Sequence, residues 1–419
     1  MLQSQLFTKT LKTSPEDEKS INSDLLIRAG YIDKLMAGVY TFLPLGFLTL
    51  KKIEKIIREE MLKLDALEIL MPVLQPKSNW QKTARWENLD TLFKFTSFYS
   101  KTDLVLGPTH EEVVSPLMKK FVFSYRDLPQ AVFQIQTKFR DEKRPKSGLL
   151  RTREFLMKDL YSFHKDEEDL DNYYQKVKEA YFKIFKRVGL SEITYLTYAS
   201  GGTFSKYSHE FQTLIKEGED TIFICDNCRV ALNKEIATDK PTCPQCGNKN
   251  LRKEKASEVG NIFKLKDKYS LPFNLVYKDK TGQEKNVLMG CYGIGIGRIM
   301  GVVVEAFNDK NGIIWPLNIS PFQIHLLSLT KNDKKAQKVY QLLLKNNFEV
   351  LFDDRVSATF AEKIKDADLI GIPYRLIVSD KTLLKNQIEI KKRNSKKIQL
   401  IDQNKLINFL KKEIKSKGE

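Results

Sequence analysis

The spacing of apolar residues predicts the first elements of the chain. Between residues 46 and 62, apolar side chains recur every three or four positions with charged residues between them, which predicts an amphipathic helix. A short, mostly apolar run follows, from Leu67 to Met71, and ends at Pro72. Because proline cannot continue a hydrogen-bonded ladder, this run predicts a strand that stops there.

A second pattern predicts a long hairpin followed by a helix. Residues 130–140 alternate apolar and polar positions, and residues 153–164 can form the antiparallel return, with a turn around residues 145–148. Residues 166–188 then have acids in the first turn and lysine and arginine in the last. That arrangement complements the helix dipole and predicts a long helix.

The pattern changes after Pro321, where short strand-like and helix-like runs alternate. The predicted strands are residues 324–329, 349–352 and 374–378, and the predicted helices are residues 333–345, 360–369 and 405–417. This alternation is typical of a separate α/β domain.

The composition of the chain indicates what kind of partner it could bind. The 419-residue chain has a formal net charge of +17, and its length suggests two or three domains. The excess charge either keeps the protein in solution or attracts a polyanion, because lysines gain affinity by displacing counterions from phosphates. No window is long and apolar enough for a membrane span, and residues 1–19 lack the apolar stretch of a secretion signal.

Four of the five cysteines form two Cys-x-x-Cys pairs. The pairs are Cys225 with Cys228 and Cys243 with Cys246. A long chain without a visible secretion signal favours reduced thiolates over disulfides, and four thiolates close a tetrahedral zinc site. We therefore expect residues 221–256 to form a zinc-ribbon-like insert organised by a structural Zn²⁺.

Basic residues crowd around the turn of the predicted hairpin. Phe139 to Glu142 are followed by Arg144, Lys146, Arg151 and Arg153. These cations would repel one another unless an anion shared the site. A nucleoside triphosphate is one such anion, since arginine can fork onto phosphate oxygens and phenylalanine can stack on a purine; a solvated basic turn is the alternative.

Gly290 to Arg298 form a second signal. The glycines at 293, 295 and 297 do not have the spacing of a Rossmann turn, and no acid follows at the ribose position. Alternating glycines allow a ligand to lie against a strand, and Arg298 can then reach into that space. A purely structural glycine strand is the alternative.

Together these two segments resemble motifs 2 and 3 of the class II aminoacyl-tRNA synthetases. Motif 2 would span about residues 136–163, and motif 3 about residues 288–305. The helix at 46–62 and the strand before Pro72 resemble motif 1, the dimer-interface element, over about residues 38–72. Three motifs in this order are far more specific than any one of them.

Within that class the chain most resembles the bacterial-type prolyl-tRNA synthetases. The loop from Gly107 to Glu112 is similar to the proline-binding loop of that family. Six further segments resemble the family nearly residue for residue: residues 136–142, 153–159, 208–211, 289–295, 353–355 and 368–373. The resemblance therefore covers most of the chain.

The resemblance implies an ATP site in which two arginines are catalytic. Arg140 would hold the α-phosphate and the substrate carboxylate, and Arg298 would hold the γ-phosphate and lie against the adenine. Phe155 would stack on the other adenine face, and Glu142 would accept a hydrogen bond from its amino group. The implied ATP-binding residues are Arg140, Glu142, Arg151, Phe155 and Arg298.

The resemblance also implies an amino-acid site and a tRNA site. The amino-acid-binding residues would be Thr109, Glu111, Arg140, His209 and Cys291, with Thr109 and Glu111 on the secondary ammonium of proline. Cys291 has no histidine base nearby in the sequence, so it is interpreted as a pocket-lining thiol. His110 has no assigned role. The anticodon contacts would be Asp354, Arg355 and Lys363.

The chain departs from the family in two places. The interval between motifs 2 and 3 is too short for the long editing insertion of the bacterial prolyl family, as in its shortened form. Residues 357–359, Ser-Ala-Thr, replace the Arg-Pro-Gly pattern that usually follows Asp-Asp-Arg, which puts one anticodon contact in question.

These observations give one expected architecture and function. We expect an α/β (α+β) protein with an antiparallel-sheet catalytic domain at 1–320, the zinc insert within it, and an α/β anticodon-binding domain at 321–419. It would attach L-proline to the proline tRNA with ATP and Mg²⁺ through a prolyl-adenylate, as a cytoplasmic homodimer.

Two other hypotheses remain open. One is an inactive tRNA-binding paralogue, against which the intact Arg140, Glu142 and Arg298 argue. The other is a sister synthetase for threonine, serine or histidine, against which the Thr109–Glu111 loop argues.

Overall fold

The computed structural model describes residues 1–13, 20–200, 207–330 and 333–415. Its contacts divide the chain into two compact units. The central unit consists of Met36–Val39 and Glu54–Val302, and the terminal unit consists of Met1–Leu35, Tyr40–Ile53 and Val303–Glu419. No helix in the described ranges is both long enough and apolar enough to cross a bilayer.

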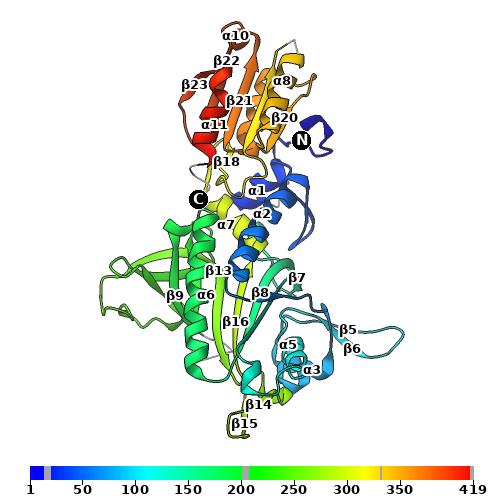
Figure 1. Ribbon diagram of the computed structural model, residues 1–419, viewed down its shortest axis with the longest axis vertical. Helices are drawn as coiled ribbons and strands as arrows, with labels where there is room; N and C mark the ends of the chain where they lie inside the picture. The colour runs from blue at the N-terminus through cyan, green and yellow to red at the C-terminus, as the bar shows by residue number, and fades with distance from the viewer. Residues whose placement is uncertain (14–19, 201–206, 331–332, 416–419) are drawn as a thin grey trace. The chain divides into compact units, whose positions relative to one another are not determined.

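The central unit is built on a large, mainly antiparallel sheet (Figure 1). Among the described residues it has nine strands in the order β10 (Tyr207–Leu214), β9 (Thr194–Ser200), β12 (Val230–Asn233), β11 (Asp220–Cys225), β13 (Arg252–Lys266), β16 (Leu288–Gly295), β8 (Glu154–His164), β7 (Gln130–Phe139) and β3 (Leu67–Glu68). β10 also pairs with β13, so β9 to β13 close into a ring of five strands. Apolar residues of these strands, including Tyr195, Ile222 and Ile224, form a small core of their own.

The predicted hairpin of motif 2 is present as β7 and β8, which pair from Gln130 opposite Phe163 to Phe139 opposite Glu154. Because side chains alternate along a strand, the sheet has two different faces. We call the face that carries Asp159 and Cys291 the front, and the face that carries Lys158 and Tyr292 the back.

The back of the sheet is covered by α6 (Glu167–Arg187), which confirms the predicted helix at 166–188. The Asp166 carboxylate caps this helix by accepting from the Asp169 amide at 2.9 Å. Tyr174 and Tyr181 of α6 are buried against the sheet. The α6 helix therefore does not cover the front of the sheet.

Smaller elements of the central unit precede and follow motif 2. They are the three-stranded sheet β4 (Leu74–Pro76), β6 (Asp103–Leu106) and β5 (Phe93–Thr96), the helices α3 (Lys77–Lys82), α4 (Arg85–Asn88) and α5 (Glu111–Met118), and the ribbon β14 (Val276–Lys278) and β15 (Glu284–Asn286). Two helices, α2 (Pro44–Leu62) and α7 (Ile296–Ala306), run across the division between the units. The first confirms the helix predicted at 46–62.

The cysteine-rich insert expected at residues 221–256 is built into the large sheet. Its strands β11 and β12 pair with β13 and β9 and so complete the five-stranded ring. Residues 237–251, which carry Cys243 and Cys246, contain no helix or strand. The sequence prediction missed this because the pairing partners lie far away along the chain.

The terminal unit contains an α/β sheet, as predicted after Pro321. The strand order is β20 (Val350–Asp353), β19 (Ile324–Leu329), β21 (Tyr374–Ser379), β22 (Gln387–Lys392) and β23 (Ile398–Asp402). The accompanying helices are α1 (Ile21–Arg28), α8 (Asp333–Lys345), α9 (Phe360–Ile370), α10 (Asp380–Leu383) and α11 (Leu406–Lys415), and the short strand pairs are β1 (Ile32–Met36) with β2 (Val39–Phe42) and β17 (Asn308–Asp309) with β18 (Gly312–Ile313). The predicted strands and helices after Pro321 are present, and the last two residues of the helix predicted at 405–417 lie outside the described residues.

The first residues of the chain belong to the terminal unit, which differs from the boundary expected at residue 320. The Phe352 amide of β20 donates to the Met1 carbonyl at 2.9 Å. The Tyr31 hydroxyl donates to the Ile370 carbonyl at 2.8 Å and accepts from the Trp315 indole at 2.7 Å. These contacts join segments that are more than 280 positions apart, which no local pattern reveals.

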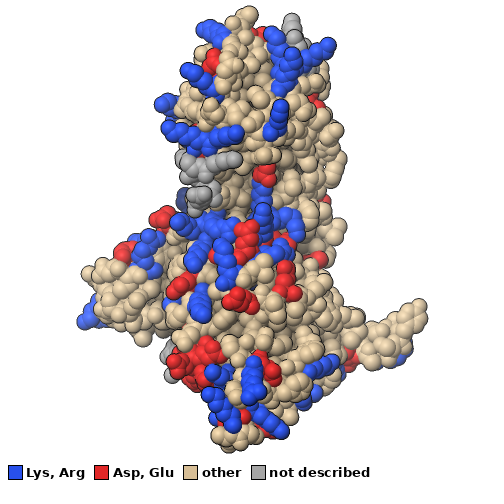
Figure 2. All heavy atoms as spheres, in the orientation of Figure 1, with Lys and Arg blue, Asp and Glu red and all other residues tan. Residues whose placement is uncertain are grey.

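One face of the β4–β6–β5 sheet is exposed and apolar. On the other face Val105 packs against Trp80 and Trp86. The exposed face carries Leu74 and Phe95, with 50% and 42% of their surface accessible. The β5–β6 hairpin projects with few charges in the view of Figure 2. Leu67 and Leu70, which precede β4 in the chain, are also apolar and are 61% and 76% exposed.

We predict that a second copy of the chain covers this apolar face, because burying a contiguous apolar surface stabilises association. Replacing Leu70 and Leu74 together with glutamate should convert a homodimer into a monomer, as measured by light scattering. Leu384→Glu is the matched control, since Leu384 is 89% exposed but lies in the terminal unit. A native protein that is monomeric at micromolar concentration would contradict the prediction.

Candidate active site

An open cavity lies on the front of the central sheet. It lies between the turn of motif 2, the middle of β13, and the junction of β16 with α7. Its lining includes all five residues expected to bind ATP: Arg140, Glu142, Arg151, Phe155 and Arg298. The structure therefore brings together side chains from both motifs that are separated by more than 140 positions.

Two guanidinium groups face this cavity. The centre of the Arg140 guanidinium lies 5.2 Å from the centre of the Phe155 ring. Burial lowers the pKa of Arg140, and the nearby positive charge of Arg298 lowers it further. Arg140 remains a cation at neutral pH, because arginine does not lose its proton in proteins. The pair therefore forms a strongly anion-binding site.

Arg298 and the motif 2 turn are held in place by polar contacts. Arg298 donates to the Leu150 carbonyl at 2.9 Å and to the Glu258 carbonyl at 3.0 Å, and it lies 3.5 Å from the Glu258 carboxylate. Arg151 donates to the Glu142 carboxylate at 2.8 Å. The Glu142 carboxylate, which lines the cavity, is therefore held by Arg151.

The loop expected to bind the amino acid lies beside motif 2 and is tightly built. A side chain on Gly107 would place its Cβ only 2.3 Å from the Gln75 amide nitrogen. That nitrogen donates to the Thr109 carbonyl at 3.0 Å, and the oxygen of the same amide accepts from the Trp80 indole at 2.9 Å. Glycine is needed at 107 because Gln75 occupies the space.

The Glu111 carboxylate is the centre of the predicted amino-acid site. It accepts from the Thr109 hydroxyl at 2.5 Å and from the Cys291 thiol at 3.3 Å. Burial raises the pKa of Cys291, and the charge of Glu111 raises it further. The thiol is therefore a donor to Glu111, which agrees with its interpretation as a pocket-lining group.

Arg85 of α4 is a residue that the sequence interpretation missed. Its guanidinium lies 3.3 Å from the Glu111 carboxylate and 3.1 Å from both oxygens of Glu112. Its centre also lies 4.9 Å from the Trp80 ring. Burial raises the pKa of Glu112 to about 7, although Arg85 opposes this. No motif marks Arg85, because it lies in a short helix between motifs 1 and 2.

The structure does not place His209 in the amino-acid site, contrary to the prediction. His209 pairs with Ile262, and Ile262 pairs with Tyr292, so its side chain is on the back of the sheet. There the Tyr174 hydroxyl of α6 lies 2.6 Å from the His209 ring. The resemblance identified the right strand, but alternation turns this side chain away from the cavity.

The neighbouring Glu210 points to the front instead, opposite Asn261 of β13. The Glu210 carboxylate accepts from the Gln212 amide at 2.8 Å. Burial raises its pKa to about 8, and the charge of Glu258 adds to this shift. Glu258 and Asn261 both line the cavity, and Asn261 donates to Glu258 at 2.6 Å. The residues after 259 have a strand-like pattern in the sequence, but nothing in the sequence indicated that Glu210 and Glu258 lie at the cavity.

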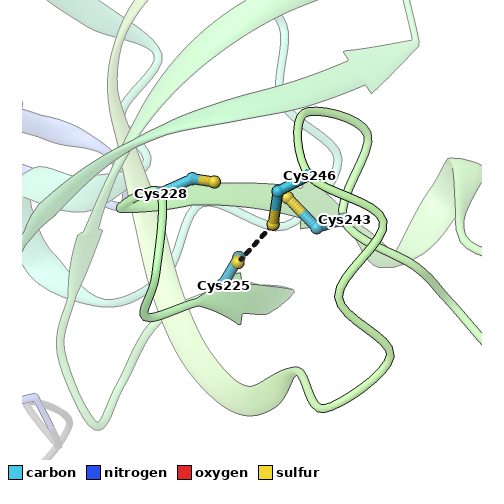
Figure 3. A group of neighbouring side chains, drawn as sticks. All are labelled: Cys225, Cys228, Cys243 and Cys246. Carbon is cyan, nitrogen blue, oxygen red and sulfur yellow. Dashed lines mark hydrogen bonds between the residues drawn. The ribbon is translucent and has the colours of Figure 1, made fainter.

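The four paired cysteines converge as predicted. Their sulfur atoms all lie within 4.8 Å of one another. Figure 3 shows two of them on the β11–β12 hairpin and two on the following loop, with the side chains directed toward a common centre. The Gly247 amide donates to the Cys243 carbonyl at 2.9 Å, where Gly247 has a φ of +72°. Glycine allows this tight turn.

The residues expected to contact the anticodon are engaged within the terminal unit. Lys363 is only 4% exposed and donates to the Ser328 carbonyl at 2.8 Å. Arg355 makes a two-point ion pair with the buried Asp353, at 2.8 and 2.7 Å. Asp354 accepts from the Ser4 amide at 2.9 Å. Lys363 and Arg355 therefore both lie beside the buried Asp353, whose charge requires nearby cations.

Comparisons with known proteins agree with this geometry. The family described as "tRNA synthetase class II core domain (G, H, P, S and T)" matches residues 93–307, and "Anticodon binding domain" matches residues 316–413. A protein of Wolbachia pipientis wMel named "Proline--tRNA ligase" is 39% identical over 419 residues, covering 97% of this chain and 98% of its own.

Two further proteins are similar to the chain, one in sequence and one in fold. A protein of the same name from Persephonella marina is 34% identical, and its alignment runs over 567 positions, covering 98% of this chain and all of its own. That relative is therefore longer than this chain. A crystal structure of prolyl-tRNA synthetase from Cryptosporidium parvum has a TM-score of 0.79 at 18% identity, over 95% of this chain and 77% of its own.

The relatives of nearly equal length are matched from end to end, and the fold and the motifs agree with them. The chain belongs to the proline–tRNA ligase family of the class II aminoacyl-tRNA synthetases.

Proposed function

We propose that the cavity and the adjoining Thr109–Glu111 loop form one active site that attaches L-proline to the proline tRNA in two steps. In the first step the carboxylate of proline attacks the α-phosphorus of ATP, and pyrophosphate leaves. In the second step the terminal ribose hydroxyl of the tRNA attacks the prolyl carbonyl, and AMP leaves. Neither step requires a covalent enzyme intermediate.

The observation that carries the proposal is the arrangement of charge on the front of the sheet. Arg140 and Arg298 share the cavity, and the carboxylate of Glu111 is near enough to Arg140 to influence its pKa. A triphosphate would balance the arginines, and the ammonium of proline would balance Glu111. The two substrates would then meet beside Arg140, where positioning and charge stabilisation supply most of the rate.

The individual roles follow from the positions of the side chains. Phe155, which lies under Arg140, offers its ring to the adenine. Arg140 would hold the α-phosphate together with the proline carboxylate, and Arg298 the γ-phosphate. Glu142, held by Arg151, would accept from the adenine amino group. Thr109, Glu111 and Cys291 would surround the proline ammonium.

Magnesium fits the same cavity. Mg²⁺ prefers carboxylate oxygens together with substrate phosphates. Glu258 lines the cavity 3.5 Å from Arg298, so its carboxylate is placed beside the expected phosphates. Glu142 is the less suitable acid, because Arg151 already binds it. A metal held by Glu258 would neutralise charge on the triphosphate.

The tRNA would contact both units. The excess of positive charge suits a polyanion, and the α/β sheet of the terminal unit matches the anticodon-binding family. Asp354 and Arg355 are the partly accessible members of the predicted anticodon set. We expect the enzyme to work in the cytoplasm, where translation consumes its product and thiols stay reduced.

Removing Arg140 tests the chemical role of the cavity. Arg140→Ala should reduce proline-dependent ATP–pyrophosphate exchange by about a hundredfold or more, since one donor to developing charge is worth about 3 kcal/mol. Arg126→Ala is the control, because Arg126 is exposed and outside the cavity. Exchange within a few-fold of the native rate in Arg140→Ala would sink the assignment.

We also propose that the four cysteines bind one structural Zn²⁺. In a tetrahedral thiolate site with Zn–S bonds of about 2.3 Å, the sulfur atoms are about 3.8 Å apart. Cys225 and Cys246 already lie 3.7 Å apart. Four protein ligands leave no open position, so the metal would tie residues 237–251 to the β11–β12 hairpin and take no part in catalysis.

Metal analysis of the purified protein should find one zinc per chain. The double variant Cys225→Ser with Cys243→Ser should release it, because two of the four thiolates are lost. The fifth cysteine supplies the matched control, since Cys291→Ser should leave the zinc in place. Native protein without zinc and with four freely titratable thiols in this cluster would rule the site out.

The last part of the proposal concerns fidelity. Alanine lacks only methylenes relative to proline, and such a difference gives about 1–3 kcal/mol of discrimination. Synthetases in this position often hydrolyse the error at a second site. Between β8 and β16 the described residues are occupied by α6, the five-stranded ring, the cysteine loop and the β14–β15 ribbon. They leave no room for an editing domain.

Preformed alanyl-tRNA of the proline type should therefore survive incubation with the purified enzyme. Its half-life, followed by acid gel electrophoresis, should equal that in buffer alone. Prolyl-tRNA in a parallel reaction is the control. Rapid enzyme-dependent loss of the alanyl species, with the prolyl species spared, would reveal an editing site.

A further inference from the structure

His110 lies at the centre of the amino-acid loop, yet neither step of the reaction uses it. Its side chain is fully buried. One ring nitrogen, Nδ1, lies 2.9 Å from the Lys138 ammonium, and the other, Nε2, lies 3.1 Å from the Pro72 carbonyl. A buried histidine with two dedicated partners has a fixed orientation.

The two partners determine where the proton of the imidazole sits. The Lys138 ammonium can only donate, so Nδ1 must accept, and the Pro72 carbonyl can only accept, so Nε2 must donate. Burial, together with the positive charge of Lys138, lowers the pKa of His110 to about 4. His110 is therefore a neutral imidazole with a single tautomer.

Lys138 is itself anchored by a buried network. Its side chain is fully buried and lies 2.7 Å from the Asp159 carboxylate. Asp159 also accepts from the Gln134 amide at 3.0 Å. A buried ammonium must be paired and hydrogen-bonded to be tolerated. Lys138 stands two positions before Arg140 on the motif 2 strand, so this network links that strand to the amino-acid loop.

Hydrogen bonds of the His110 backbone connect this residue to the side chains that are expected to bind the substrate. Its amide donates to the Tyr161 hydroxyl at 3.0 Å, and that hydroxyl lies 3.2 Å from the Thr109 hydroxyl. Its carbonyl accepts from the Val114 amide at 2.8 Å in the first turn of α5. Glu111 is the first residue of that helix. Moving His110 would therefore move Thr109 and Glu111 together.

We propose that His110 and Lys138 are positioning residues, which hold Thr109 and Glu111 in the geometry that binds the amino acid. The inference rests on the proposed function, in which Thr109 and Glu111 bind proline. It adds that the loop is held by hydrogen bonds to a fixed imidazole and a buried ammonium. Neither of these two groups touches the substrate.

The test measures Michaelis constants for proline and for ATP separately in the exchange assay. His110→Phe keeps an aromatic ring of similar size but removes both hydrogen bonds. It should raise the proline KM about tenfold or more, because small displacements of binding groups are costly, and it should leave the ATP KM within about twofold. His110→Gln retains a donor and an acceptor and should recover most of the loss.

Two further variants separate positioning from a general effect on folding. Lys138→Met should raise the proline KM like His110→Phe. His164→Phe is the matched control, since His164 is also fully buried in the central unit but pairs with Asp169 at 3.0 Å on the back of the sheet. It should leave the proline KM unchanged. If His110→Phe does not fold, as judged by circular dichroism, Lys138→Met and His110→Gln carry the test.

The possible outcomes keep the inference distinct from the proposed function. If Glu111→Gln leaves the proline KM unchanged, the assignment of the loop itself is wrong. If Glu111→Gln raises the proline KM but neither His110→Phe nor Lys138→Met raises it, only the positioning inference fails. Equal increases in the proline and ATP constants, or failure of His110→Gln to recover, would also overturn it.

Discussion

Two guanidinium groups in one cavity impose the main constraint on the central unit. Arg140 and Arg298 come from segments far apart in the sequence and line one cavity, where Arg298 lies 3.5 Å from the Glu258 carboxylate. The lowered pKa of Arg140 records the cost of burying one cation near another. Two neighbouring cations repel each other, so the rest of the fold must hold them in place. A bound polyanion would compensate their charge.

The sheet meets this constraint by keeping its two faces chemically different. The front carries the arginines, Glu111 and the buried Lys138–Asp159 pair. The back is covered by the tyrosines of α6, where burial lowers the pKa of Lys158 to about 7. Because each strand alternates, a register shift by one residue would exchange the two faces. The antiparallel pairing of β7, β8, β16 and β13 therefore determines the active site as much as the functional residues do.

Much of this arrangement follows from the sequence where the determining signal is local. The α6 helix, the motif 2 hairpin and the cysteine pairs depend on spacing over a few residues, and the structure agrees with each. The five predicted ATP-binding residues also converge, although the resemblance to a family, and not periodicity, indicated them.

The remaining features depend on contacts between distant segments. The closing of the five-stranded ring, and the docking of the first residues on β20, join positions with no shared local pattern. His209 was expected in the amino-acid site but lies on the back of the sheet, because a motif gives the strand but not the side to which each residue points. Arg85 and Glu258 were missed because single charged residues outside a motif do not differ from surface charges in a sequence.

The proposed active site is tested most directly by ATP–pyrophosphate exchange with each of the twenty standard amino acids in turn. The charge arrangement and the Thr109–Glu111 loop predict strong exchange with proline, weak exchange with alanine, and background with all others. Exchange that depends on a different amino acid and not on proline would contradict the assignment of the loop. Absence of exchange with every amino acid, in a folded protein that still binds tRNA, would contradict the assignment of the cavity.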